Sequence, residues 1–300
     1  SDAYRTDDIF RIASMTKAIT TVSILQLYER GLLGLDDPIG NYLPAFRQMQ
    51  LLDNFNPADS SYTTTEVKRP ITIRQLLTHT SGITYGSFNP GKIGAVYAQH
   101  EMNAVGLSHP EWTTSEMVDR LARVPLVFTP GDRYMYGLNM EVLGRIVEVV
   151  TGKTLADYFR THIFEPLGMK DTYFYLPADK HSRLVPVFTY DQDGSWTLIP
   201  PGNLDYPKAT PRNHYAGGGG LSSTALDYAR FIHTLELNHS GHGYPLLGRK
   251  TMELMTSDQI ARLKEEGKGF TKIDGLTYGL GFALYTDQGA GIDSKSPGTF

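Results

Sequence analysis

The sequence predicts an α+β fold in which a sheet flanked by helices is joined to a second, mostly helical domain. Apolar side chains recur at helical spacing in residues 14–31, 115–122, 140–150 and 155–163, whereas short β-rich segments bounded by Gly, Asp and Pro dominate after residue 172. A helical middle between mixed segments indicates a discontinuous α/β domain of residues 1–35 and 176–300 around a mostly helical domain of residues 36–175. A cleft between two such parts is where a site usually lies.

Each element of the first half follows from a local signal. Residues 9–13 are typical of a strand end or turn, and the helix that begins at Ser14 ends at Gly31. Pro38 is expected at the first position of another helical segment. Further helices are predicted at residues 73–77, 115–122, 140–150 and 155–163, the last broken by residues 166–168. Two stretches of weak pattern, 48–69 and 86–112, are predicted to be an excursion loop and a loop that walls the site.

The second half is predicted to be richer in strands. Alternating or β-branched segments occur at residues 173–175, 184–190, 196–199 and 278–285. One more helix is predicted at residues 224–235, where Thr224 and Asp227 have the spacing of a capping box.

Composition excludes several classes of protein. The 300 residues contain 28 Lys and Arg against 32 Asp and Glu, a net charge of −4 without a basic cluster, which argues against nucleic-acid binding. Apolar runs are too short for a membrane span, and the absence of cysteine excludes disulfides, thiolate catalysis and Cys-zinc sites. No signal-peptide pattern is visible at the start, so the compartment stays open between bacterial cytoplasm and periplasm.

Ser14 and Lys17 form a Ser-x-x-Lys motif at the start of a predicted helix. Residues three apart share a helix face, so the hydroxyl and the ammonium can meet. A serine nucleophile needs a group that takes its proton, and a nearby lysine can take it or assist another base. The motif alone fits an N-capping serine with a solvent-facing lysine at least as well.

Tyr136 stands at the entry to a predicted helix, after the turn at residues 130–131. Tyrosine is a poor base at neutral pH, but a neighbouring ammonium favours the phenolate, so a Tyr–Lys pair is a credible proton acceptor. The alternative is that Tyr136 packs a domain interface, as one of 18 tyrosines. The glycines at 217–220 allow close approach of a ligand or a strand, or simply make a flexible connection.

Other catalytic motifs are missing from the sequence. It contains no Gly-x-Ser-x-Gly and no His-Glu-x-x-His. His239 and His242 are interpreted as surface histidines, so no metal site is predicted, and His79 is expected to order the turn at Gly82.

In this order, the segments resemble the serine β-lactamase-like superfamily, in the branch of class C β-lactamases, DD-peptidases and family VIII carboxylesterases. The segments that carry the resemblance are residues 10–17, 76–82, 125–136, 142–144, 166–172 and 217–231. The resemblance implies an antiparallel sheet flanked by helices beside the helical domain. It also implies acyl transfer with Ser14 as nucleophile, Lys17 as its partner and Tyr136 as general base. The backbone N–H of Ser14 would be one oxyanion donor, and no metal or organic cofactor is expected.

Two departures from the family pattern shape the functional prediction. Class C β-lactamases and peptidases usually carry Tyr-x-Asn, whereas Leu138 stands two places after Tyr136 and Asn139 comes one place late, which resembles the family VIII esterases. The third motif, Lys/His/Trp-x-Gly, has no credible match, since residues 239–241 follow a helix in a turn. We therefore expect a chain truncated at both ends relative to the family.

The resulting prediction is a serine carboxylesterase that cleaves small to medium acyl esters through a covalent acyl-enzyme. The alternatives are a class C-type β-lactamase, a D-amino-acid peptidase, an acyltransferase, or a catalytically silent binding protein on the same fold. The partner is expected to be a small-molecule ester or lactam. The residues predicted to contact it are Leu138, Gly219, Gly220 and Trp112.

Overall fold

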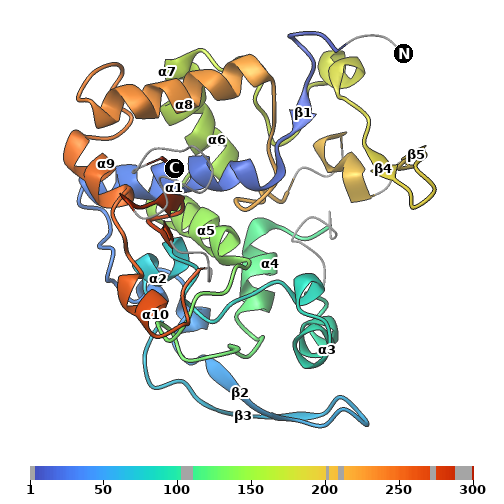
Figure 1. The fold of residues 1–300 in the computed structure, drawn as a ribbon, viewed down its shortest axis with the longest axis vertical. Helices are drawn as coiled ribbons and strands as arrows, with labels where there is room; N and C mark the ends of the chain where they lie inside the picture. The colour runs from blue at the N-terminus through green and yellow to red at the C-terminus, as the bar shows by residue number, and fades with distance from the viewer. Residues whose placement is uncertain (1–3, 103–110, 201–202, 209–212, 271–274, 288–298) are drawn as a thin grey trace.

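Helix α5 (Asn139–Thr151) is the centre of the fold in the computed structural model, which describes residues 4–102, 111–200, 203–208, 213–270, 275–287 and 299–300. It packs against α1 (Thr16–Glu29), α2 (Ile73–Leu77), α4 (Thr114–Leu121) and α6 (Leu155–Phe159), as Figure 1 shows. The remaining α-helices are α3 (Lys92–Gln99), α7 (Glu165–Leu167), α8 (Ala225–His239), α9 (Arg249–Met255) and α10 (Ala261–Glu265).

Helix α1 is buried around its whole circumference. Every residue from Thr16 to Leu27 is buried, so this helix lies inside the core instead of showing one apolar stripe to it. It ends before Gly31, whose φ of +68° favours glycine. A 3₁₀ turn, η1 (Ala13–Met15), precedes it, so the predicted helix is confirmed and its first turn is tighter than an α-helix.

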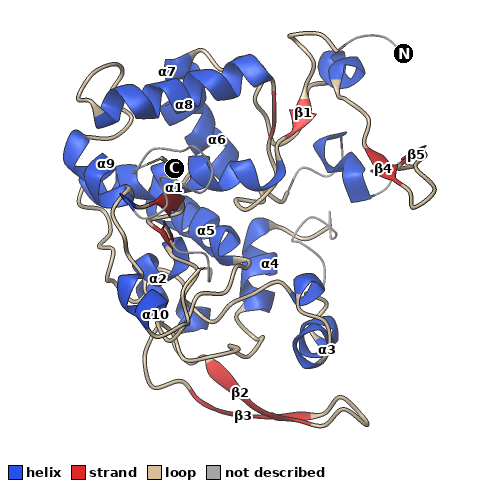
Figure 2. Ribbon diagram, viewed as in Figure 1, coloured by secondary structure: helices blue, strands red, loops and turns tan. Residues whose placement is uncertain are grey.

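The strands are few and short (Figure 2). They form antiparallel pairs: β1 (Phe10–Arg11) with β6 (Ser222–Ser223), β2 (Gln50–Phe55) with β3 (Tyr62–Glu66), β4 (Phe188–Tyr190) with β5 (Trp196–Leu198), and β7 (Leu276–Tyr278) with β8 (Ala283–Tyr285). The predicted antiparallel pairing is therefore present. Within the described residues, however, these pairs do not join into the one sheet that we expected. The structure is a helix-rich α+β fold.

The prediction of a loop at residues 48–69 is wrong, because this stretch forms the β2–β3 hairpin (at the bottom of Figure 1). Its second strand carries the run Thr63-Thr64-Thr65, and β-branched residues of this kind favour an extended, pleated backbone. The stretch 86–112, also predicted as a loop, contains the 3₁₀ turn η4 (Gly86–Phe88) and helix α3, while residues 103–110 lie outside the described part.

Most other predicted helices are confirmed, with changes at their ends. Helix α6 continues beyond the predicted end at residue 163, through a π-helical turn, η5 (Arg160–Phe164), and α7, and it ends at Gly168, inside the predicted break at residues 166–168. Pro166 lies in the first turn of α7, directly after the π-helical turn, which already interrupts the regular i to i−4 hydrogen bonding of the helix. Pro38 precedes the 3₁₀ turn η2 (Ile39–Asn41) and is not its first residue.

Among the predicted strands, residues 173–175 contribute only an isolated bridge between Tyr173 and Ser222. The β-rich stretch 278–285 is part of the β7–β8 hairpin. Further 3₁₀ turns are η3 (Pro44–Phe46), η6 (Ala178–Arg183) and η7 (Asn203–Lys208).

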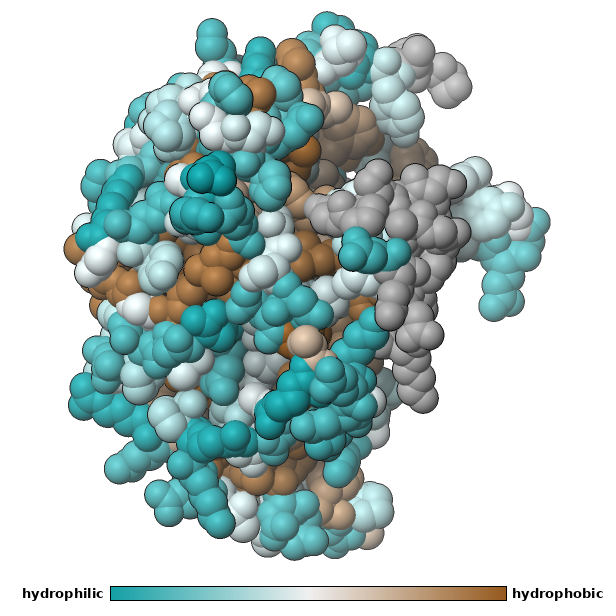
Figure 3. Space-filling view, turned by 60° about the vertical axis from the view of Figure 1, so that its left-hand side comes forward, coloured by the Kyte–Doolittle hydropathy of each residue, from teal (hydrophilic) through white to brown (hydrophobic). Residues whose placement is uncertain are grey.

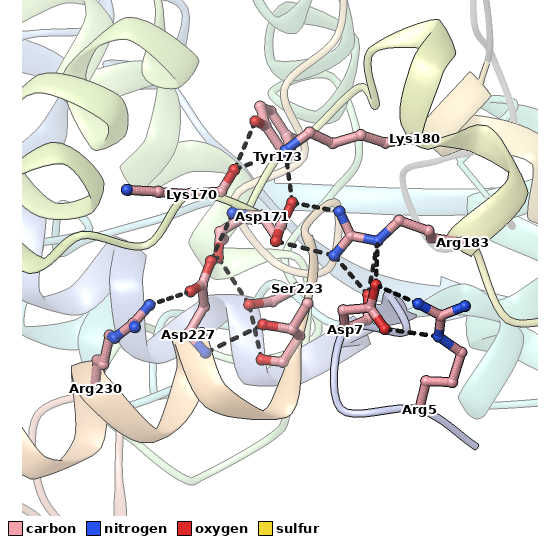
Figure 4. Close-up of polar contacts among 12 residues, drawn as sticks. Arg5, Asp7, Lys170, Asp171, Tyr173, Lys180, Arg183, Ser223, Asp227 and Arg230 are labelled. Atoms are coloured by element: carbon pink, nitrogen blue, oxygen red, sulfur yellow. Dashed lines mark hydrogen bonds and ion pairs between the residues drawn. The ribbon is translucent and has the colours of Figure 1, made fainter. Parts of the chain in front are cut away.

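A network of charged groups ties the start of the chain to the segment after α7 and to α8 (Figure 4). Arg183 donates to both carboxylate oxygens of Asp171 at 2.9 Å and to the backbone oxygen of Asp7. The backbone N–H of Asp171 donates to Asp227 at 2.7 Å. Thr224 caps α8 by accepting from the N–H of Asp227, but the Asp227 carboxylate bonds Asp171 and Arg230, so only half of the predicted capping box forms.

Hydrophilic side chains cover much of the molecular face in Figure 3, and apolar side chains show through as an interrupted band across its middle. None of the helices in the described residues combines the length and the apolar character that a membrane span requires. The division into domains of residues 1–35 with 176–300 and of residues 36–175 stays a prediction.

Candidate active site

Ser14 lies in the 3₁₀ turn that leads into α1, with its side chain exposed. The preceding residue, Ala13, has a φ of +43°, a region that costs an L-residue about 1 kcal/mol or more. Backbone strain held by the surrounding structure is frequent at functional sites. On one side the turn is fixed by the N–H of Ile12, which donates to the backbone oxygen of Leu221 at 3.0 Å.

Lys17 lies one turn after Ser14, and it is buried. Its ammonium has three hydrogen-bond acceptors: Ser14 Oγ at 3.2 Å, the backbone oxygen of Gly218 at 2.6 Å and the hydroxyl of Tyr85 at 3.4 Å. Three acceptors match the three N–H bonds of an ammonium group. The predicted proximity of Ser14 and Lys17 is therefore present, and the lysine does not face solvent as in the alternative interpretation.

Tyr136 reaches the same point from the loop between α4 and α5. Its hydroxyl lies 2.8 Å from Ser14 Oγ, and the Lys17 ammonium lies 4.8 Å from the centre of its ring. Gly137 allows this approach, because a Cβ atom there would lie 2.4 Å from the backbone of Ile83 and Thr84. The structure thus brings together the three residues for which the sequence predicted catalysis. Such a group can move a proton between a serine hydroxyl and a tyrosine oxygen beside a fixed cation.

The glycine segment 217–220 lies against α1 and α5. Thr20 donates to the oxygen of Gly217 at 2.7 Å, and a Cβ at residue 217 would lie 2.5 Å from the oxygen of Met140. The segment therefore serves close backbone packing against two helices, where the sequence predicted close approach of a ligand or a strand. The N–H groups of Gly219 and Gly220 both donate to the oxygen of Ala216, so the two predicted substrate contacts already use their amides inside the protein.

Two further predicted substrate contacts lie in the core. Leu138 is 0% exposed at the start of α5, and Trp112 is 9% exposed, with the Arg120 guanidinium 4.3 Å from its ring centre. A side chain without exposed surface packs against protein, so the structure does not bring Leu138 to the surface at Ser14. Trp112 belongs to the same core cluster. Contact of these residues with substrate stays a prediction.

Asn139 and His79 form a buried pair behind Tyr136. Asn139 bonds His79 Nδ1 at 2.8 Å and accepts from the Ser81 hydroxyl at 2.5 Å. His79 lies 4.7 Å from Tyr136 between ring centres, and its backbone oxygen accepts from the N–H of Met135. Complete burial, followed by the charge of Lys17, lowers the pKa of His79 to about 3. His79 is therefore neutral and supports the Tyr136 loop, and its expected function of ordering the turn at Gly82 stays a prediction.

Two buried residues near Lys17 were missed by sequence reasoning. Tyr85 is 4% exposed, and burial, the charge of Glu141 and then Tyr136 raise its pKa well above the usual range, so its hydroxyl keeps its proton. Glu141 is 1% exposed on α5 and accepts from the N–H of Gly218 at 3.0 Å. Burial raises its pKa to about 7, although Lys17 and the amides of Gly218 and Gly217 favour its charged form.

Neither residue is obvious in the sequence. An acid in the first turn of a helix ordinarily interacts with the helix dipole, which is how Glu141 would be interpreted. His239 and His242 are not part of a group of three or more possible metal ligands in the described part of the chain.

Comparison with known proteins shows which family this chain belongs to. The Beta-lactamase family profile matches residues 1–300. An uncharacterized protein of Mycobacterium tuberculosis is 33% identical over 298 residues, covering 97% of this chain and 70% of its own length. The lovastatin esterase of Penicillium rubens is 35% identical over 234 residues, covering 77% of this chain. This chain spans only 56% of the length of that esterase.

Among solved structures, simvastatin synthase (LovD) from Aspergillus terreus superposes with a TM-score of 0.80 at 28% identity. The match covers 98% of this chain and 73% of that enzyme, so the two share the β-lactamase/transpeptidase-like fold. Profile, sequence and structure agree over nearly all of the chain: it belongs to the beta-lactamase family of serine hydrolases.

Proposed function

We propose that this protein is a serine esterase that cleaves small to medium acyl esters through an acyl-enzyme on Ser14. The observation that carries the proposal is the position of Ser14 Oγ, 2.8 Å from the Tyr136 hydroxyl and 3.2 Å from the Lys17 ammonium. Two hydrogen bonds of this kind orient a nucleophile and give its proton a path.

Acylation and deacylation use the same groups. The Ser14 oxygen bonds the acyl carbon while its proton passes to the oxygen of Tyr136, which acts as the general base beside the Lys17 ammonium. Tyr136 then gives this proton to the leaving alkoxide as the acyl–oxygen bond breaks. In the second half, water bonds the acyl carbon and gives its proton to Tyr136. The Ser14–acyl bond breaks, and the serine oxygen recovers a proton from Tyr136, which releases a carboxylic acid.

Esters are favoured over lactams by the residues after Tyr136. The amide that class C β-lactamases and peptidases place two residues after the tyrosine is replaced by Leu138, which is buried, and the side chain of Asn139 is occupied by His79 and Ser81. The similarity to a lovastatin esterase also supports an ester over a lactam as the substrate. The similarity to simvastatin synthase, an enzyme named for synthesis, favours transfer of the acyl group to an acceptor other than water as the second candidate.

The test compares initial hydrolysis rates of p-nitrophenyl butyrate and a chromogenic cephalosporin, using purified full-length wild type and Ser14→Ala. We expect ester turnover that disappears in Ser14→Ala, with little cephalosporin turnover. Dominant cephalosporin turnover would replace the esterase by a β-lactamase. No Ser14-dependent turnover of either compound would reject ester hydrolysis, and addition of an alcohol acceptor would then test for acyl transfer.

A further inference from the structure

Glu141 is a buried carboxylate that lies close to the proposed machinery without touching Ser14 or Tyr136. Its Oε1 accepts from the N–H of Gly218 at 3.0 Å, while its Oε2 is buried and has no hydrogen-bond partner among the described residues. An ionised carboxylate buried without a direct counter-ion is costly. A glutamine at this position would accept the same hydrogen bond without that cost, so the charge itself needs an explanation.

The charge that balances Glu141 is the ammonium of Lys17. Both side chains meet at Gly218, whose N–H donates to Glu141 and whose backbone oxygen accepts from Lys17 at 2.6 Å. There is no ion pair between Lys17 and a carboxylate in the part of the chain that is described. The three N–H bonds of Lys17 are directed instead to Ser14, Tyr85 and Gly218.

The link between Glu141 and Lys17 through Gly218 leaves all three N–H bonds of Lys17 free of a salt bridge within the described residues. A direct salt bridge would take an N–H bond of Lys17 away from Ser14 or Tyr85. Placing the carboxylate on the far side of Gly218 keeps the compensating negative charge in a low-dielectric core, where it acts over a longer distance than in water. Glycine at residue 218 leaves room for this contact, because a Cβ there would lie 2.6 Å from Glu141 Oε1 and would displace the carboxylate.

We propose that Glu141 is a positioning residue, whose carboxylate fixes Gly218 and, through the backbone oxygen of Gly218, keeps the ammonium of Lys17 directed at Ser14. The inference rests on the proposed function. The groups that face Glu141 are Lys17 from α1, Tyr85 from the loop after α2, and the amides of Gly217 and Gly218. Protonation of Glu141 removes the charge that balances Lys17 and so weakens activation of Ser14.

The variant Glu141→Gln tests the charge while keeping an oxygen acceptor for Gly218. Glu148→Gln is the matched control. Glu148 lies seven residues along the same helix, its side chain is 9% exposed and it accepts from the N–H of Leu155 at 3.1 Å. It differs in being paired with Arg145 at 3.0 Å, away from Ser14.

The readout is the rate at which a fluorophosphonate labels Ser14, followed by intact-protein mass between pH 5 and 9. We expect the wild-type rate to rise with pH through about 7, where Glu141 ionises. Glu141→Gln should label at least about tenfold more slowly at pH 8 and lose this rise, and Glu141→Asp should recover part of both. Glu148→Gln should match wild type.

Two controls make the outcome decisive. Thermal unfolding of each variant separates loss of activation from loss of fold, because Glu141→Gln removes a buried charge and should remain folded. Labelling needs no natural substrate, so it is independent of whether esters are hydrolysed. A Glu141→Gln protein with the wild-type rate and the wild-type pH profile would overturn the inference.

Discussion

The hydroxyl of Tyr136 lies 2.8 Å from Oγ of Ser14, although the two residues are 122 positions apart in the chain. Lys17 is close to both, 3.2 Å from the serine oxygen and 4.8 Å from the centre of the tyrosine ring. Ser14 and Lys17 are close because they share one helical turn. Tyr136, by contrast, comes close to Ser14 only when the loop before α5 folds against α1. Several consequences of this packing can be measured.

Tyr136→Phe removes the proton carrier and keeps the ring. We expect kcat for p-nitrophenyl butyrate to fall by about 10²–10⁴-fold, because proton transfer by a positioned side chain contributes that much. Circular dichroism should give an unfolding temperature close to that of wild type, since the half-buried ring still packs against His79 and Tyr85. Tyr173→Phe, which removes one exposed bond to the Lys170 backbone oxygen, is the control and should keep full activity. Full activity in Tyr136→Phe would refute proton transfer by this residue.

Alanine substitutions in the glycine segment should separate packing from substrate contact. In Gly217→Ala the new methyl group meets the Met140 backbone oxygen at 2.5 Å, so we expect a loss of about 1–3 kcal/mol in the free energy of unfolding. In Gly219→Ala the nearest atom is the carbonyl carbon of Ala13 at 4.0 Å, so the change should stay within about 0.5 kcal/mol. Urea titration measures both. If Gly219 contacts substrate, as the sequence predicts, Gly219→Ala should raise KM; an unchanged KM would remove it from the binding residues.

His79 should make the fold sensitive to acid. Its pKa is about 3 in the folded protein against an ordinary value of 6.5, so the unfolded chain takes up a proton first as the pH falls. The free energy of unfolding should therefore decrease from about pH 6.5 down to about pH 3, by on the order of 3–5 kcal/mol from this group.

The variant that checks this is His79→Asn, because asparagine tolerates the φ of +53° at this position. Urea unfolding at a series of pH values should show a shallower slope over that range than wild type. His233→Asn, at a side chain 66% exposed on α8, should leave the slope unchanged. Parallel wild-type and His79→Asn profiles would contradict a neutral buried His79.

The Asp171 network should contribute stability that is lost in acid. The hydrogen bonds from Arg183, followed by those from Lys180, lower the pKa of Asp171 below its ordinary value of 3.8. Its contribution is therefore complete above about pH 4 and disappears as the pH falls through the lowered pKa. At pH 7, Asp171→Asn should cost about 1.5–3 kcal/mol, the range for hydrogen bonds to a charged group. Asp157→Asn, whose side chain is 53% exposed and paired with Arg160, should cost less than about 0.5 kcal/mol by the same denaturant assay. Equal costs would mean that the network adds nothing beyond surface ion pairs.

Local signals predicted much of the helical framework. The helices α1, α2, α4, α5 and α8 lie where periodicity, capping residues and glycine ends placed them. The β2–β3 hairpin was missed because its strands are mostly exposed and carry no clear alternation of apolar and polar residues. The helix that comprises α6 and α7 extends beyond its predicted end at residue 163. Proline signals a helix end in the sequence, but it is tolerated in the first turn of α7.

By itself, the sequence determined the catalytic candidates Ser14, Lys17 and Tyr136, because the ordered segments around them resemble one family, although each motif taken alone also fits ordinary helix capping or packing. Only the tertiary structure decided which side chains surround them. Leu138 is turned into the core, and Glu141 faces Gly218 because α5 packs where the glycine segment crosses it. Burial and electrostatic pairing depend on contacts between segments far apart in the chain, and the spacing of residues along one helix does not encode them.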